Sequence, residues 1–232
     1  CSDPAIPLDE TNLALRAVRL FEKETGTEQS CTIHLEKRIP AGAGLGGGSS
    51  NAAAGLPGLN QMSGGPIPPP RLLSISARPG SDVPFFLLNT AAGTGTGRGE
   101  IVAPIPFPWE LPLVMIKPPF PIPTPWAYQR WASSRELHGI PYAPQICPWG
   151  QMLNDLGRPV FEKHLLLPAL KTQLLGSSHT LAALMSGSGS TMFAITRTAV
   201  AAENLAAQAR EWCGDTALVL VTHTMSDGVV PP

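Results

Sequence analysis

The chain has 232 residues, which is enough for one large domain or two small ones with a sizeable core. Its formal net charge is −1 and only 14% of its residues are charged, which argues against a basic surface for nucleic acid. The four cysteines show no CxxC spacing, so a reduced protein is favoured over a disulfide scaffold or a zinc site. No uncharged apolar run is long enough to span a membrane, and we expect a cytoplasmic protein.

The first 36 residues predict a helix followed by a strand. Residues 9–25 predict the helix, because Asp9 to Asn12 offer N-caps and apolar residues then recur at helical spacing. Gly26 stands where a C-cap is expected. Cys31–Glu36 alternates apolar and polar residues, which predicts a strand with one buried face.

A second helix is predicted from about Gly48, and Pro57 should kink it or end it early. Residues 71–77 predict a short third helix. Asp82 is the first acidic residue after Glu36 and directly precedes an apolar segment that we expect to be a strand. On the local sequence alone, Asp82 is equally a turn former or a base or metal ligand.

The rest of the chain alternates between strands and helices. Residues 91–100 predict a glycine-rich strand or hairpin, and a second unit is expected to begin near Pro108. Residues 117–128 form a proline-rich, aromatic loop that leads into a helix. Further strands are predicted at 111–116, 181–184, 192–195 and 217–222, and helices at 165–175 and 199–212. This alternation indicates an α/β sandwich in two parts.

The most informative stretch of the sequence is glycine-rich. Positions 42–48 hold five glycines, which leave the backbone open and free to adopt positive φ. Ser49, Ser50 and Asn51 then lead into an alanine run that favours a helix. A glycine loop that enters a helix N-terminus is an anion site, because the first N–H groups and the helix dipole both favour phosphate.

Common nucleotide motifs do not account for this stretch. Gly42, Gly44 and Gly47 match the dinucleotide fingerprint in spacing, but that fingerprint requires an acidic residue about 20 positions later, and residues 51–81 contain none. A P-loop requires a lysine before its last Ser or Thr, and Gly48-Ser49-Ser50 lacks it. The protein-kinase glycine loop requires a His-Arg-Asp motif that does not occur here.

The remaining pattern, Pro40-x-x-x-Gly44-Leu45-Gly46-x-x-Ser49-Ser50, resembles the phosphate loop of the GHMP kinases (galactokinase, homoserine kinase, mevalonate kinase and phosphomevalonate kinase). Other segments resemble the branch of that superfamily that phosphorylates 4-diphosphocytidyl-2-C-methyl-D-erythritol. These segments are Leu8–Leu13, Gly80–Phe86, Gly97–Glu100, Pro123–Pro125 with Tyr128, Asn154–Leu156 and Ser186–Thr191. They occur in the order of that family and cover nearly the whole chain.

The resemblance implies a role for each of three groups of residues. Asp82 matches the catalytic aspartate, which takes the proton from the substrate's hydroxyl. The residues implied to bind the ATP phosphates are Pro40, Ala41, Gly42, Ala43, Gly44, Leu45, Gly46, Gly47, Gly48, Ser49 and Ser50. The residues implied to line the substrate side are Thr124, Tyr128, Ser186, Gly187, Ser188 and Gly189. ATP and Mg²⁺ are the implied cofactors, with no metal site made by the protein alone.

The implied fold class is α+β, made of two-layer α/β sandwiches. Residues 1–108 would form the ATP-binding domain, which is ribosomal-protein-S5-like and lacks its first strands. Residues 109–232 would form a ferredoxin-like domain on the substrate side. We expect a monomer or a weak homodimer in a bacterial cytosol rather than a plastid.

The implied function is ATP-dependent phosphorylation of the 2-hydroxyl of the cytidine diphosphate-linked methylerythritol, in the non-mevalonate isoprenoid pathway. The family's Lys-x-Asn-Leu segment does not occur in the chain, so we expect impaired activity in the chain as given. Two alternatives stay open: a non-catalytic nucleotide-binding fragment of such a kinase, and another GHMP small-molecule kinase.

Overall fold

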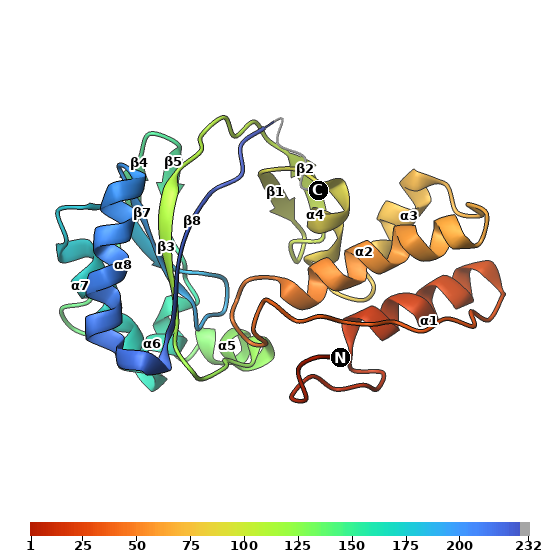
Figure 1. The fold of residues 1–232 in the computed structure, drawn as a ribbon, viewed down its shortest axis with the longest axis horizontal. Helices are drawn as coiled ribbons and strands as arrows, with labels where there is room; N and C mark the ends of the chain where they lie inside the picture. The colour runs from red at the N-terminus through yellow and green to blue at the C-terminus, as the bar shows by residue number, and fades with distance from the viewer. Residues whose placement is uncertain (228–232) are drawn as a thin grey trace. The chain divides into compact units, whose positions relative to one another are not determined.

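A computed structural model describes residues 1–227. These residues divide into two compact units, and the ribbon is drawn in Figure 1. Unit 1 contains residues 1–41 and 46–107 together with Asp227, and unit 2 contains residues 42–45 and 108–226. Within the described part of the chain, no helix is both long and apolar enough to cross a membrane.

Two helices pack side by side in unit 1 (Figure 1). Helix α1 covers Leu13–Thr25, as the sequence predicts. The side chain of Asn12 caps its N-terminus by accepting from the Ala14 N–H, and Gly26 ends it in the left-handed conformation. Helix α2 covers Gly47–Met62. Phe21 of α1 and Leu56 of α2 are fully buried in the apolar core between them.

The expectation that Pro57 would end its helix early is wrong, because α2 continues past it to Met62. Pro57 lies on the exposed side of the helix, whereas Leu56 and Leu59 on the other side are buried. Packing of the apolar face therefore maintains the helix. Pro57 has no N–H to donate to the Ala53 carbonyl, and the packing compensates for this missing hydrogen bond.

The rest of unit 1 is short helices and a hairpin. Helix α3 covers Pro69–Ser76, close to its predicted range. Helix α4 covers Val83–Leu88, where the sequence predicted a strand. Strands β1 (Gly93–Thr96) and β2 (Ile101–Pro104) form an antiparallel hairpin, in agreement with the predicted glycine-rich hairpin.

The predicted strand at Cys31–Glu36 is absent, although its residues are among those described. The backbone of this segment pairs with no neighbouring strand, and the side chain of Ile33 is 40% exposed. An alternating pattern produces a strand only where a partner strand satisfies its N–H and C=O groups. No such partner is present within residues 1–227.

Unit 2 is built on a four-stranded antiparallel sheet with the strand order β6-β7-β3-β8. Its strands are β3 (Pro112–Lys117), β6 (Thr180–Met185), β7 (Met192–Thr196) and β8 (Leu218–His223). The order and the intervening helices give the β-α-β-β-α-β topology of a ferredoxin-like fold. The predicted α+β class and the four predicted strands of this sheet are confirmed.

Helices cover one face of this sheet. Helix α7 (Leu166–Gly176) and helix α8 (Ala199–Cys213) lie on the same side of it (Figure 1). Their buried side chains form one apolar core with side chains from all four strands. Helix α5 (Thr124–Trp131) follows the predicted aromatic loop. The sequence did not predict helix α6 (Gly157–Lys163), the hairpin of β4 (Gln145–Cys147) and β5 (Gly150–Met152), or the 3₁₀ turn Gly214–Thr216.

Candidate functional site

The glycine stretch adopts the backbone that its sequence predicts. Gly42, Gly44 and Gly46 have φ values of 59°, 73° and 66°, in the left-handed region that favours glycine. Gly42–Leu45 belongs with unit 2, and the residues from Gly46 onward belong with unit 1. The two halves of the loop therefore belong to different units.

In unit 2, the first half of the loop packs tightly against two other loops. The carbonyl of Gly42 accepts from the N–H groups of Ile122 and Ser190, at 3.2 and 3.3 Å. The hydroxyl of Ser186 donates to the carbonyl of Gly44 at 2.8 Å. A Cβ at Gly44 would lie 2.1 Å from the carbonyl oxygen of Ser186, so no other residue fits there.

The loop at Ser186–Thr191 is itself held in place. Asn154 donates from its Nδ2 to the carbonyls of Met185 and Gly187, at 2.7 and 2.8 Å. Ser188 is 6% exposed, and its hydroxyl lies 2.7 Å from that of Thr124. The structure thus brings together three of the predicted segments: Gly42–Leu45, the start of α5 and the loop at Ser186–Thr191.

Tyr128 and Thr124 both lie on α5, one turn apart. Tyr128 is 64% exposed, which excludes a role in the core and leaves its ring accessible for stacking on a planar group. The Thr124 hydroxyl lies in the first turn of the helix, next to Ser188.

In unit 1, the second half of the loop opens α2. Gly46 is the N-cap, and the first turn of the helix contains no acidic side chain. Ser49 is 9% exposed, and the Ser50 hydroxyl donates to the carbonyl of Gly47 at 3.0 Å. The N–H groups of this first turn have no intrahelical acceptor, so they can bind an anion.

A lysine beside this helix start was missed by the sequence reasoning. Lys37 donates from its Nζ to Oδ1 of Asn51 at 3.0 Å, and its Nζ lies 3.4 Å from where a Cβ of Gly47 would be. This ammonium group adds a positive charge to the end of the helix where the dipole already favours an anion. The only signal in the sequence was a basic residue three positions before Pro40.

Asp82 lies at the N-cap position of α4 and is exposed. Its carboxylate makes no hydrogen bond or ion pair with any residue that the structure describes, so its oxygens remain available to a ligand. The predicted strand after Asp82 is a helix because Pro84 lies in its first turn, where proline is favoured. Asp82 therefore stands at a loop-to-helix junction.

Asp82 and the start of α2 are linked through the packing of unit 1. The side chain of Leu13 lies 3.3 Å from where a Cβ of Gly48 would be and 3.7 Å from the same point at Gly80. The ring of Phe86, in α4, packs against Gly46. The segment that carries Asp82 therefore packs against the N-terminal end of α2 through Leu13 and Phe86.

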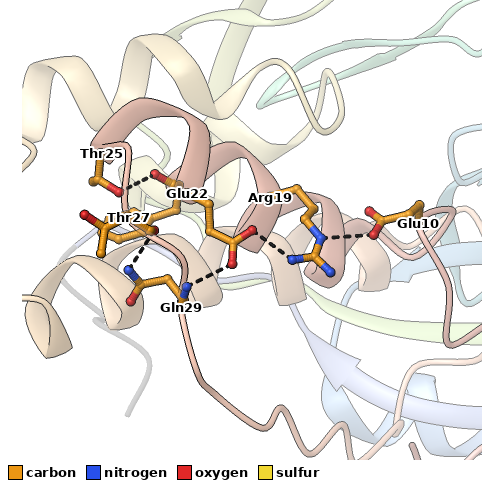
Figure 2. A network of polar contacts seen from close by, with 7 residues as sticks. Glu10, Arg19, Glu22, Thr25, Thr27 and Gln29 are labelled. Carbon is orange, nitrogen blue, oxygen red and sulfur yellow. Dashed lines mark hydrogen bonds and ion pairs between the residues drawn. The ribbon is translucent and has the colours of Figure 1, made fainter.

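A separate polar network lies along α1 (Figure 2). Arg19 pairs with Glu10 at 3.0 Å and with Glu22 at 2.8 Å, and Glu22 also accepts from the Gln29 N–H at 2.9 Å. The Gln29 N–H and then Arg19 lower the pKa of Glu22. Arg19 and Gln29 border an open cavity of about 350 Å³ whose other lining residues are mostly apolar. It contains none of the predicted site residues, so we do not assign it to the reaction.

The described residues contain no cluster of three or more His, Cys, Asp or Glu side chains suited to a metal ion. All four cysteines are free thiols in the structure. Burial raises the pKa of the Cys147 and Cys213 thiols, which makes them poor nucleophiles.

Two family models match the chain. The N-terminal domain model of the GHMP kinases matches residues 12–90, and the C-terminal model of the same kinases matches residues 148–215. Together with the glycine loop and the ferredoxin-like unit, these matches define the class of the protein as a GHMP small-molecule kinase.

Curated relatives define the family more closely. The chain is 38% identical over 197 residues to the 4-diphosphocytidyl-2-C-methyl-D-erythritol kinase of Protochlamydia amoebophila, covering 84% of this chain and 67% of that protein. It is 41% identical over 190 residues to the kinase of the same name from Methylacidiphilum infernorum, covering 82% and 66%. For the chloroplastic enzyme of Mentha piperita the identity is 42%, and the chain spans only half of that protein's length.

Solved structures agree with this assignment. A crystal structure of a 4-(cytidine 5′-diphospho)-2C-methyl-D-erythritol kinase superposes with a TM-score of 0.73 at 30% identity, covering 94% of this chain and 80% of that one. A homoserine kinase from Cytophaga hutchinsonii has a TM-score of 0.70 at 21% identity, which shows the shared fold alone. The chain belongs to the 4-diphosphocytidyl-2-C-methyl-D-erythritol kinase family.

Proposed function

We propose that this protein transfers the γ-phosphoryl group of ATP to the 2-hydroxyl of 4-diphosphocytidyl-2-C-methyl-D-erythritol. The observation that carries the proposal is the joint presence of a left-handed glycine loop at the start of α2 and a carboxylate without partners at Asp82. Phosphoryl transfer depends mainly on positioning and charge neutralisation, and these two features supply both.

The glycine loop would hold the phosphates of ATP. The first N–H groups of α2 provide donors, and the absence of acidic side chains in this turn keeps the site positive. The Lys37 ammonium adds a positive charge at the same helix end. Pro40–Ser50 is therefore the proposed phosphate-binding segment.

Asp82 would act as the base that accepts the proton of the substrate's hydroxyl. Its exposed carboxylate makes no interaction that would have to break first. Carboxylate and hydroxyl oxygens are suitable donors for Mg²⁺, which keeps several water and phosphate ligands of its own. A magnesium ion bound mainly by the phosphates of ATP would neutralise their charge during transfer.

The substrate side would be formed in unit 2. The paired hydroxyls of Thr124 and Ser188 can donate to or accept from a polar substrate group, and the exposed Tyr128 ring can stack on a base. Ser186, Gly187 and Gly189 keep the loop in place beside Gly44. These contacts support a pocket for the cytidine end of the substrate.

The proposed domain division is 1–108 for the ATP-binding domain and 109–232 for the substrate-side domain, and residues 228–232 lie outside the described part of the chain. A cytoplasmic location and a monomer or weak homodimer remain part of the same proposal.

An assay that couples ADP release to NADH oxidation tests the proposed reaction, with 4-diphosphocytidyl-2-C-methyl-D-erythritol, mevalonate and homoserine as alternative substrates. We expect ADP release above the ATP-only background with the first substrate alone. Release with mevalonate or homoserine instead would assign the chain to another GHMP kinase.

A second candidate is a nucleotide-binding fragment without catalytic activity. The observation in its favour is that the chain spans 67% and 66% of two bacterial relatives and half of the plant relative. Calorimetry separates the two candidates. Binding of both ATP and the cytidine substrate with no transfer of phosphate supports the fragment, whereas binding with transfer supports the kinase.

A further inference from the structure

The turn between β3 and α5 has an unusual backbone. Residues 118–123 include four prolines, at positions 118, 119, 121 and 123. Proline has no N–H group, so this turn can satisfy few of its own carbonyls. Donors from elsewhere must supply the missing hydrogen bonds if the turn is to keep one conformation.

Lys117, the last residue of β3, supplies two of these donors. Its side chain is buried, with 8% of the residue exposed, and its Nζ donates to the carbonyls of Pro118 and Phe120 at 2.5 and 3.0 Å. No carboxylate within residues 1–227 pairs with it. Burial lowers the pKa of this amine.

The Phe120 carbonyl connects Lys117 to the glycine loop. It also accepts from the hydroxyl of Ser190 at 2.6 Å, and Ser190 is fully buried. The N–H of Ser190 in turn donates to Gly42, whose carbonyl is shared with the N–H of Ile122. One ammonium group therefore binds a carbonyl of the turn that is linked through Ser190 to the loop at Ser186–Thr191 and, from there, to Gly42 in the first half of the glycine loop.

We infer that Lys117 is a positioning residue for ligand binding, and this inference rests on the proposed function. The Lys117 ammonium group holds the Phe120 carbonyl so that these three segments keep their binding geometry. Lys117 itself is buried behind the turn and would contact neither ATP nor the substrate. It would act through Thr124, which follows the turn, and through Gly42.

Stability alone does not explain a lysine at this place. Removing an ammonium group from water is costly, and neutral carbonyls compensate for it only in part. An apolar side chain at the end of β3 would avoid that cost. The lysine adds a donor that reaches two carbonyls of a turn in which the prolines have no N–H groups to donate.

Lys171 offers a matched control. It is also buried in unit 2, with 4% exposed, and it donates to a backbone carbonyl, that of Pro141. Burial lowers the pKa of its amine as well. It lies on α7 near the rings of Tyr142 and Phe161, and it makes no hydrogen bond to the turn at 118–123, the loop at Ser186–Thr191 or Gly42–Leu45.

The first test is amide hydrogen exchange in the full chain, with the variants Lys117→Met, Lys117→Arg and Lys171→Met. We expect Lys117→Met to accelerate exchange by about tenfold at Ile122 and Ser190, which corresponds to the loss of one charged hydrogen bond. Lys117→Arg should restore slow exchange, and Lys171→Met should leave these amides unchanged. Equal exchange in Lys117→Met and the unchanged protein would overturn the inference.

The second test is calorimetric titration of the same variants with 4-diphosphocytidyl-2-C-methyl-D-erythritol. We expect Lys117→Met to weaken binding by about tenfold and Lys171→Met to leave it unchanged. Equal weakening by both variants would mean a purely structural role. If the unchanged protein does not bind the substrate, the proposed function fails, and the exchange experiment still decides the role of Lys117.

Should Lys117→Met not fold, Ser190→Ala takes its place, because it removes the other donor to the Phe120 carbonyl. The same amides are then expected to exchange faster, while amides of α8 stay protected. Uniform acceleration that includes α8 would contradict a local positioning role.

Discussion

The ring of Phe86 covers Gly46, so that a Cβ at Gly46 would lie 2.5 Å from Cζ of that ring. Phe86 belongs to α4, the helix that Asp82 precedes, and Gly46 is the N-cap of α2. This aromatic contact within unit 1 therefore joins the helix that follows the proposed base to the start of the proposed phosphate-binding helix.

Replacing Gly46 with alanine should weaken ATP binding and destabilise unit 1. The substitution forces a Cβ into the Phe86 ring and places alanine at a φ of 66°, which costs at least about 1 kcal/mol. Calorimetry with ATP and urea unfolding measure the two effects. Gly58→Ala is the control, because a Cβ at Gly58 has open space in the same helix and should stabilise it. Unchanged ATP affinity in Gly46→Ala would contradict the proposal that the glycine loop binds the phosphates of ATP.

Replacing Asp82 with asparagine should reduce kcat by about 10²- to 10⁴-fold, the usual contribution of a general base. ATP affinity should change little, because the asparagine keeps the shape of the side chain and α4 does not depend on a cap from Asp82. Steady-state kinetics and calorimetry on the same preparation measure both quantities. A variant with unchanged turnover would remove Asp82 from its proposed role.

Replacing Thr124 with valine should raise the KM for the cytidine substrate and leave the KM for ATP nearly unchanged. Valine keeps the shape of threonine but leaves the Ser188 hydroxyl without its partner at 2.7 Å. Thr172→Val is the control, since the Thr172 hydroxyl donates to the Pro168 carbonyl within α7. Equal effects of the two variants on the KM for the cytidine substrate would argue against a pocket at Thr124.

The stability of unit 1 should fall as the pH falls through the acidic range. Glu24 accepts hydrogen bonds from Arg71 and Arg78, and these arginines, Arg71 first, lower the pKa of its carboxyl below the ordinary 4.5. A depressed pKa in the folded state contributes stability above pH 4.5 that is lost as the carboxyl becomes protonated. Glu24→Gln should therefore lower the urea midpoint at pH 7 and lower it less at pH 3. Glu28→Gln, at an exposed position, provides the control. An equal loss of stability in Glu24→Gln at both pH values would contradict a contribution from the ionised Glu24 carboxylate.

Replacing Pro57 with alanine should stabilise the protein by about 1–3 kcal/mol. Alanine restores an N–H group in the middle of α2 and removes the clash of the proline ring with the preceding turn. Urea unfolding measures the change. Pro69→Ala, at the first position of α3, should have little effect because proline is well tolerated there. A loss of stability in Pro57→Ala would show that the proline is required by packing.

The sequence was most informative where the structure is determined locally. The caps of α1 at Asn12 and Gly26 and the glycine pattern from Gly42 to Gly46 each depend on the conformational preferences of single residues, and all were predicted. The resemblance to the GHMP kinases was confirmed because it uses such local motifs in a fixed order.

The failures came where the local pattern is ambiguous or where the contacts that matter leave no trace in it. Periodicity cannot distinguish a short apolar helix from a buried strand, so the segment after Asp82 was predicted wrongly. The segment at Cys31–Glu36 needed a partner strand that is not among the described residues. Lys37 and Lys117 were missed because their partners, an amide 14 residues away and two backbone carbonyls, leave no residue pattern.

The most direct test of the proposed reaction is a single-turnover experiment with γ-³²P-labelled ATP and 4-diphosphocytidyl-2-C-methyl-D-erythritol. The unchanged chain and Asp82→Asn are compared at enzyme concentrations above that of ATP, so that even slow transfer is detected. We predict that the unchanged chain places label on the cytidine substrate and that Asp82→Asn does so far more slowly. Equal transfer by the two proteins, or none by the unchanged chain although both ligands bind, would contradict the proposal.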